Sequence, residues 1–198
     1  MQGILLCGSV ARGTARPGSD LDLRLYWRES RPFVACQKQG VMVEQHGHTL
    51  AHAEEQIERA DLNLYAWTEG RILHDPDGEL ARLQARAREL LAVYQTPETE
   101  RRTLRHWLAS ALAKLEGMPD DLQAAFLVQT TIWKLAEGVC AVNNRPSPPG
   151  TLMWELLPTL PVQPRSWLEP LLLGTSEERA DTFIRVGGWL LRELSPRR

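Results

Sequence analysis

Two aspartates that follow a glycine-serine pair near the start of the 198-residue chain have the types and spacing needed for metal chemistry. Gly8 and Ser9 follow an apolar run, and Asp20 and Asp22 come after an intervening loop. Because side chains alternate along a strand, the two aspartates should lie on one face, where their charges repel unless a cation lies between them. Carboxylate oxygens suit Mg²⁺, which also binds substrate phosphates. The spacing therefore predicts a magnesium site.

The intervening loop has the composition of a phosphate-binding loop. Gly8 would let the backbone approach phosphate, and the Ser9 hydroxyl and nearby amides could donate hydrogen bonds to phosphate oxygens. Further glycines permit tight turns, while Arg12 and Arg16 add positive charge. This composition predicts that the loop holds a triphosphate and its departing pyrophosphate beside the metal.

Two short strands should position this loop. Residues 4–7 are apolar enough for a buried strand, and residues 21–26 alternate as a half-buried strand does. Leu21, Leu23 and Leu25 would fill the face opposite to the aspartates. The expected local structure is a strand, a tight loop and a second strand.

The whole run from Gly8 to Asp22 resembles the signature of the DNA polymerase β-like nucleotidyltransferase superfamily. Its Ala-Arg-Gly and Ser-Asp-x-Asp elements most resemble the small bacterial branch of minimal and aminoglycoside nucleotidyltransferases. A run of this length at fixed spacing is more specific than an isolated Gly-Ser or Asp-x-Asp pair. The alternative is an exposed turn followed by a surface strand that happens to carry two aspartates.

The resemblance implies an enzyme that moves a nucleoside monophosphate from a nucleoside triphosphate, with ATP as the default, to an acceptor hydroxyl. Pyrophosphate would be released. It also implies nucleotide binding by Gly8, Ser9, Arg12 and Ser19, and two Mg²⁺ ions, or Mn²⁺, as cofactors. The acceptor stays open, because a small molecule, a protein or an RNA end each offers a hydroxyl.

The superfamily requires a third carboxylate on a neighbouring strand, and Glu44 fits this requirement. Residues 41–46 alternate so that Glu44 and His46 share a face. One metal ion would be held by Asp20, Asp22 and Glu44, and the other by the two aspartates and phosphate oxygens. Aspartate is common at the third position in the superfamily. Whether Glu44 ligates the metal directly, acts mainly as a general base or is only an exposed strand acid stays open.

Three nearby histidines, His46, His48 and His52, raise the alternative of a zinc site. No cysteine lies near them at the spacing of a closed structural site, and the strand should end near Gly47. Polar histidines at a strand edge are the favoured interpretation, and a substrate contact by His46 stays open.

The rest of the chain predicts an α+β fold, in which a mixed-sheet nucleotidyltransferase domain over residues 1–95 is followed by an all-α bundle over residues 96–198. A helix, a strand and a helix should complete the first domain at residues 50–59, 70–75 and 77–94. Helices of the bundle are expected at residues 97–117, with Thr96 as the cap, 119–142, 154–157 and 167–172, and after a capping box at 175–178. Apolar residues at helical spacing are expected in its core, including Trp107, Leu122, Phe126, Trp133, Trp154, Trp167 and Ile184.

The bundle resembles, by pattern alone, the C-terminal domain of kanamycin nucleotidyltransferase and the HEPN bundles that partner minimal nucleotidyltransferases. A HEPN ribonuclease would carry an arginine followed at a short spacing by a histidine, as Arg101 and His106 are. A solvated basic helix face is the favoured interpretation. A ribonuclease, and a nucleotide-binding module related to toxin–antitoxin systems that lacks turnover, stay as alternatives. The bundle could also form a homodimer.

Composition narrows the classes of partner. The 23 Lys and Arg residues are balanced by 25 Asp and Glu, which argues against an extended grip on duplex nucleic acid. Three sparse cysteines predict reduced thiols without a disulfide framework. No uninterrupted segment of membrane-spanning length is expected, so the sequence predicts a cytoplasmic protein without a membrane partner.

Overall fold

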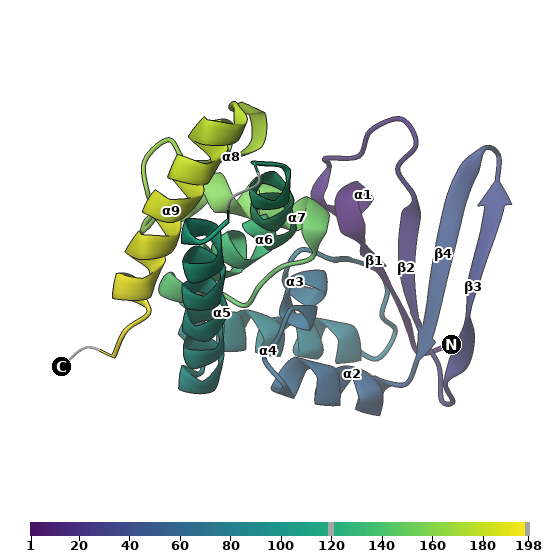
Figure 1. Cartoon of the computed structure of the whole chain (residues 1–198). Helices are drawn as coiled ribbons and strands as arrows, with labels where there is room; N and C mark the ends of the chain where they lie inside the picture. Colours follow the sequence, from purple (N-terminus) through teal and green to yellow (C-terminus); the bar gives the residue numbers. More distant parts are fainter. Residues whose placement is uncertain (119–120, 197–198) are drawn as a thin grey trace. The chain divides into compact units, whose positions relative to one another are not determined.

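A mixed five-stranded sheet organises the first part of the chain (Figure 1). Its strands are β1 (Gly3–Cys7), β2 (Leu21–Tyr26), β3 (Arg31–Lys38), β4 (Val41–His48) and β5 (Arg71–His74). The order is β3-β4-β2-β1-β5, in which β2 and β4 run parallel and the other neighbours antiparallel. The computed structural model describes residues 1–118 and 121–196. Its contacts divide the chain into a sheet unit, Met1–Tyr94, and a helical unit, Gln95–Arg198.

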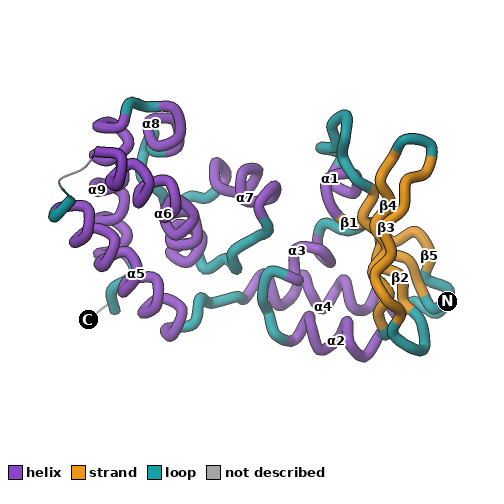
Figure 2. Tube along the Cα trace, turned by 45° about the vertical axis from the view of Figure 1, so that its right-hand side comes forward, coloured by secondary structure: helices purple, strands orange, loops and turns teal. Residues whose placement is uncertain are grey.

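Helices of the sheet unit lie on one side of the sheet (Figure 2). They are α1 (Gly8–Arg12), α2 (Leu50–Glu58), α3 (Asn63–Thr68) and α4 (Glu79–Val93). The predicted apolar stripe of α4 is buried through Leu80, Leu83 and Ala87, and it packs with Leu5 and Tyr26 of the sheet. Burial of this stripe removes apolar surface from water and holds the sheet against the helices.

Strands and helices that the sequence predicted in the sheet unit are present, but helix α3 was not predicted and three further features differ. The loop after β1 begins with a helical turn, α1, which ends at Gly13 with a φ of 77°. Strand β3 was not predicted; it pairs with β4 through a turn in which Gln39 and Gly40 both have positive φ. Strand β4 ends at His48, near Gly47 as predicted, but it lies between β3 and β2 and is therefore not at a sheet edge.

The helical unit contains α5 (Glu98–Glu116), α6 (Asp121–Val142), α7 (Gly150–Leu156), the 3-10 turn η1 (Leu157–Thr159), α8 (Leu168–Leu173) and α9 (Ser176–Glu193). Helix α6 packs against α5 and α9. The predicted capping box before α9 is confirmed, because the Thr175 hydroxyl accepts from the Glu178 amide and the Glu178 carboxylate accepts from the Thr175 amide. Helix α5 differs, since the Thr96 hydroxyl donates to the Ala141 carbonyl and does not cap the helix.

Several apolar residues that the helical spacing assigned to the core are exposed. Among the tryptophans, Trp167 is buried as predicted, whereas Trp107, Trp133 and Trp154 are exposed. The expectation is also wrong for Leu122, Phe126 and Ile184. Helical periodicity marks every apolar residue near one stripe, but a small bundle has room only for those that face a neighbouring helix.

Within the described residues, the segment Leu122–Val142 of α6 is long and apolar enough to cross a membrane, by length and composition only. The sequence predicted no uninterrupted segment of this length, and Lys134 and Glu137 interrupt this one. Leu135, Val139 and Cys140 of this helix are fully buried in the core of the helical unit. Because a core helix passes the same test, the composition of α6 is weak evidence for a membrane segment.

Candidate active site

Three carboxylates meet near the start of β2. Asp22 of β2 and Glu44 of β4 are direct neighbours in the parallel register, and Asp20 immediately precedes β2. One oxygen from each residue lies within 4.8 Å of the others, and all three residues are half-buried. Among the residues that the structure describes, this is the one group of three or more acidic, histidine or cysteine side chains placed to hold a metal ion. An all-oxygen set of this kind fits Mg²⁺ or Mn²⁺.

The charges of this cluster oppose one another. Burial raises the pKa of Asp22 above its ordinary value of 3.8, and the negative charges of Asp20 and Glu44 raise it further. Nearby positive charge on Arg24 and His46 acts in the opposite direction. A divalent cation would relieve the repulsion that the three carboxylates exert on each other.

Gly8 lies directly against the Asp22 carboxylate. Its φ is +68°, and a Cβ at this position would lie 2.0 Å from the Asp22 Oδ2 atom. Only glycine therefore leaves room for this carboxylate. The sequence predicted a glycine here for the approach of phosphate, and the Asp22 carboxylate is a second reason that restricts the position to glycine. Gly13, at the other end of α1, has a similar φ of +77°, but a Cβ there would meet nothing within 4 Å.

The other residues predicted to bind nucleotide have different surroundings. The Ser19 hydroxyl accepts a hydrogen bond from the Arg16 amide at 2.9 Å, which closes the turn before Asp20. The Arg12 Nη1 atom lies 3.6 Å from Glu69 Oε2, and its side chain is only 12% exposed. Ser9 is half-buried in α1. The structure thus brings Gly8 and the three carboxylates together, places Ser19 in the turn, and pairs Arg12 with Glu69.

Arg24 is a neighbour of the site that the sequence analysis missed. It lies two positions after Asp22 on the same face of β2 and opposite His46 of β4. Its Nη1 atom is buried and has no hydrogen-bond partner within the described protein. Alternation along β2 was the available signal, because it places every second side chain of that strand on the face of the carboxylates.

The three histidines near Glu44 form a row of rings. The His46 and His48 ring centroids are 6.3 Å apart and those of His48 and His52 are 5.1 Å apart. In the described part of the chain, no histidine joins a group close enough to hold a metal ion, so the zinc alternative has no support. Because β4 is an inner strand, His46 and His48 are not the edge histidines that the sequence favoured, and His52 lies in α2.

Substitution of His48 by phenylalanine should reduce the loss in free energy of unfolding that occurs as the pH is lowered. Burial, followed by the positive charges of Arg24, His52 and His46, lowers the pKa of His48 from 6.5 to about 4. The neutral ring is therefore favoured in the folded state, and its stabilising contribution, present above pH 6.5, is lost as the pH falls towards 4. Urea unfolding at a series of pH values measures this slope. An identical slope in wild type and His48→Phe would contradict the assignment.

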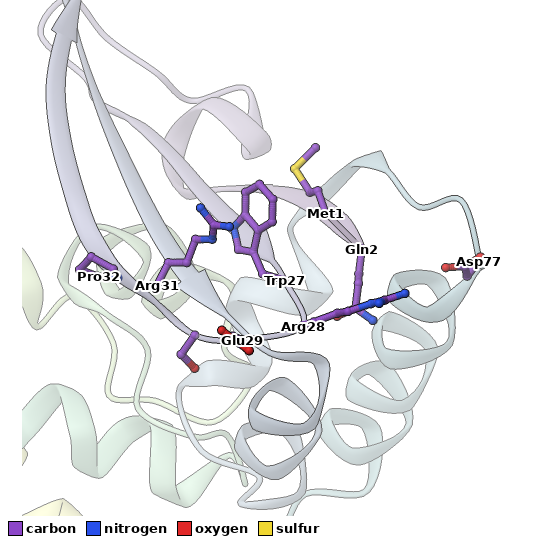
Figure 3. A pocket seen from close by; sticks show the side chains of 9 residues that line it. Met1, Gln2, Trp27, Arg28, Glu29, Arg31, Pro32 and Asp77 are labelled. Carbon is purple, nitrogen blue, oxygen red and sulfur yellow. The ribbon is translucent and has the colours of Figure 1, made fainter.

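A cavity of about 740 Å³ lies at the other end of β2 (Figure 3). It is lined by Trp27, Arg31 and Asp77 among others, and the Arg31 guanidinium lies over the Trp27 ring, 4.1 Å from its centroid. Trp27 is five residues after Asp22, a separation of about 16 Å along a strand. This cavity is therefore separate from the carboxylate cluster.

Arg101 and His106 do not form a joint site. The Arg101 guanidinium donates to the carbonyl oxygens of Glu193 at 2.7 Å and Ala141 at 3.3 Å, at the C-terminal ends of α9 and α6. His106 is exposed, with its ring 6.2 Å from that of Trp107. Five positions on a helix correspond to a rotation of about 140°, which directs the two side chains to different faces. The ribonuclease alternative gains no support from this geometry.

Replacement of Arg101 by alanine should instead lower the stability of the helical unit. Two carbonyl oxygens at helix ends would lose a charged donor, at a cost of about 1–3 kcal/mol. Substitution of the exposed His106 by alanine should change the free energy of unfolding by less than about 0.5 kcal/mol. Urea unfolding of both variants tests this difference. RNA cleavage that is lost equally in both variants would favour a nuclease pair instead.

Comparisons with known proteins agree with this fold. A family model described as nucleotidyltransferase domain matches residues 2–134. Eight chains of solved structures match, including a nucleotidyltransferase-like protein from Exiguobacterium sibiricum. That structure is 19% identical in sequence, with a TM-score of 0.51, and the match covers 96% of this chain and 68% of that one. This identity is evidence for a shared fold alone. No curated protein matches the sequence significantly.

Proposed function

Because this chain belongs to the nucleotidyltransferase domain family, we propose that it moves a nucleoside monophosphate from a nucleoside triphosphate, ATP by default, to an acceptor hydroxyl. The observation that carries the proposal is the meeting of Asp20, Asp22 and Glu44, with one oxygen of each within 4.8 Å of the others. The close contact between Gly8 and Asp22 also supports the proposal, because a side chain at position 8 would displace the Asp22 carboxylate.

Asp20, Asp22 and Glu44 would hold two Mg²⁺ ions, for which Mn²⁺ could substitute. When bound, the ions supply Lewis acidity to the acceptor oxygen and to the leaving phosphate. The Ser9 hydroxyl and the backbone beside Gly8 would hold phosphate oxygens. Strand β2 fixes the orientation of the Asp22 carboxylate, and Asp20 immediately precedes this strand. A rigid strand preserves this geometry better than a loop does.

In this reaction the acceptor oxygen forms a bond to the α-phosphorus, and the bond from that phosphorus to the bridging oxygen of pyrophosphate breaks. The hydroxyl proton would leave to solvent by way of Glu44, which lies on β4 between β2 and β3. An in-line displacement would require the acceptor oxygen to approach the α-phosphorus on the side opposite the departing pyrophosphate.

Label transfer tests this function. The protein is incubated with each α-phosphate-labelled nucleoside triphosphate and Mg²⁺, with and without cell extract, beside the variant Asp20→Asn/Asp22→Asn. We expect metal-dependent labelling of one component of the extract, release of pyrophosphate, and loss of both in the variant. Transfer that survives in the double variant would refute the proposal. Metal-dependent nucleotide binding without transfer would identify a binding module instead.

A further inference from the structure

The surface of the sheet beside Glu44 is exposed and apolar. Ala35 of β3 lies directly opposite Glu44 in the antiparallel register and has a small side chain, and the Glu44 side chain is 33% exposed. Phe33 is 53% exposed and Met42 is 45% exposed. The closed end of the β3–β4 hairpin lies away from α2 and α4 (Figure 1). Large apolar side chains exposed together beside a charged cluster are typical of a ligand-binding surface.

Two rings lead from this surface to Glu44. The ring centroids of Phe33 and His46 are 4.8 Å apart with an interplanar angle of 44°. The His46 Nε2 atom also lies 4.0 Å from Glu44 Oε2. A flat ring stacked on this pair would carry a substituent at its edge to the Glu44 carboxylate, where the acceptor hydroxyl is needed. Aromatic pairs of this spacing contribute binding energy beyond the burial of their area.

The charges around the two rings disfavour a polycationic acceptor. In residues 31–48, Glu44 is the one acidic residue, whereas Arg31 and Lys38 are basic. Arg24 adds a further positive charge opposite His46. Because metal ions would take up the charge of the three carboxylates, the hairpin has no acidic group left for the ammonium groups of an aminoglycoside. Two fixed cations on the hairpin are also too few to follow an RNA backbone.

We propose that Phe33 and His46 form an acceptor subsite for a hydroxyl carried on a flat, uncharged ring, of which a phenol is the simplest case. This inference rests on the proposed nucleotidyl transfer and adds to it the class of acceptor. The ring oxygen bonds to the α-phosphorus, pyrophosphate departs, and the phenolic proton passes to solvent by way of Glu44. Phe33 and His46 act by holding the ring, and Glu44 receives the proton.

The experiment compares three acceptors in the presence of ATP labelled at the α-phosphate and Mg²⁺: N-acetyl-L-tyrosinamide, kanamycin and a short RNA oligonucleotide. The phenol should be the acceptor that is labelled. Phe33→Ala should raise the KM for the phenol about two- to tenfold with kcat unchanged, and Phe33→Tyr should restore it. The matched control is Phe126→Ala, which removes an equally large ring, 70% exposed, from the helical unit and should leave KM unchanged.

A second measurement does not depend on turnover. Titration of the metal-free protein with N-acetyl-L-tyrosinamide should shift the NMR signals of the His46 ring, and Phe33→Ala should weaken this binding by the same factor. Labelling of kanamycin or RNA in place of the phenol, or an unchanged KM in Phe33→Ala, would overturn the subsite and leave the transferase intact. Absence of transfer to all three acceptors, with nucleotide binding that is unaffected by Asp22→Asn, would overturn both proposals.

Discussion

Asp22→Asn should reduce nucleotidyl transfer by about a thousandfold or more while leaving the chain folded. Asp22 lies at the centre of the carboxylate cluster, beside Glu44 in the strand register and against Gly8. An amide cannot replace the charge with which this side chain would hold a divalent cation. Stabilisation of the transition state by bound metal amounts to several kcal/mol, and each 1.36 kcal/mol corresponds to about a tenfold change in rate.

The same substitution should make the metal-free protein at least as stable as wild type. Burial and two neighbouring carboxylates raise the pKa of Asp22 in the folded state, so folding favours its protonated form. The protonated side chain therefore stabilises the folded state at low pH, and this stabilisation is lost as the pH rises through the raised pKa of Asp22. Near neutrality the ionised carboxylate of the metal-free protein is unfavourable. Asparagine removes this charge. Mg²⁺ should then raise the melting temperature of wild type but not that of the variant.

Thermal unfolding with Mg²⁺ and with EDTA, together with the label-transfer assay, measures both effects. Asp181→Asn provides the matched control, because it makes the same chemical change on an exposed face of α9 in the helical unit. The control should retain transfer and the Mg²⁺ response. Full transfer by Asp22→Asn, or an equal response of both variants to Mg²⁺, would show that the carboxylate cluster is not the metal site.

Gly8→Ala should be the second most damaging change. An alanine at φ +68° costs about 1–2 kcal/mol in backbone strain, and its Cβ would also lie 2.0 Å from Asp22 Oδ2. The carboxylate or the start of α1 must then move. Displacement of a reacting group by about 1 Å typically costs about a hundredfold in rate, so transfer should fall by at least this factor.

Gly13→Ala separates the two causes. It carries the same kind of backbone strain at φ +77°, but its Cβ would meet nothing within 4 Å. Gly8→Ala should therefore lose at least as much stability as Gly13→Ala in urea unfolding, whereas only Gly8→Ala should lose transfer and the Mg²⁺-dependent rise in melting temperature. Equal losses of transfer in both would indicate that the conformation of α1, and not the position of Asp22, limits the reaction.

Local patterns in the sequence predicted most elements of the sheet unit but missed α1, β3 and α3. Residues 31–38 begin with arginine and proline and do not alternate cleanly, because an edge strand tolerates proline and needs no buried face. Helix α3 has only six residues, and its start depends on Asp61, whose carboxylate accepts from the Asn63 amide at 2.8 Å. Signals this short are hard to separate from a loop.

The candidate site shows the same division. Asp20 and Asp22 were assigned from their spacing, and Glu44 was assigned from the requirement of the superfamily for a third acid. The structure adds that Glu44 is the direct neighbour of Asp22 in the strand register. Their joint role as metal ligands is a prediction that Asp22→Asn and Asp20→Asn/Asp22→Asn test.

The sequence by itself determined the local chemistry of this protein: a loop with glycine and serine, two aspartates on one strand face, and apolar stripes along the helices. Only the tertiary structure decided that β4 lies beside β2, that Phe33 adjoins His46, and that several apolar residues of the helical unit face outward. The physical reason is that propensity and periodicity act between residues close in the chain. Strand pairing and burial depend instead on contacts between segments that are far apart in the chain.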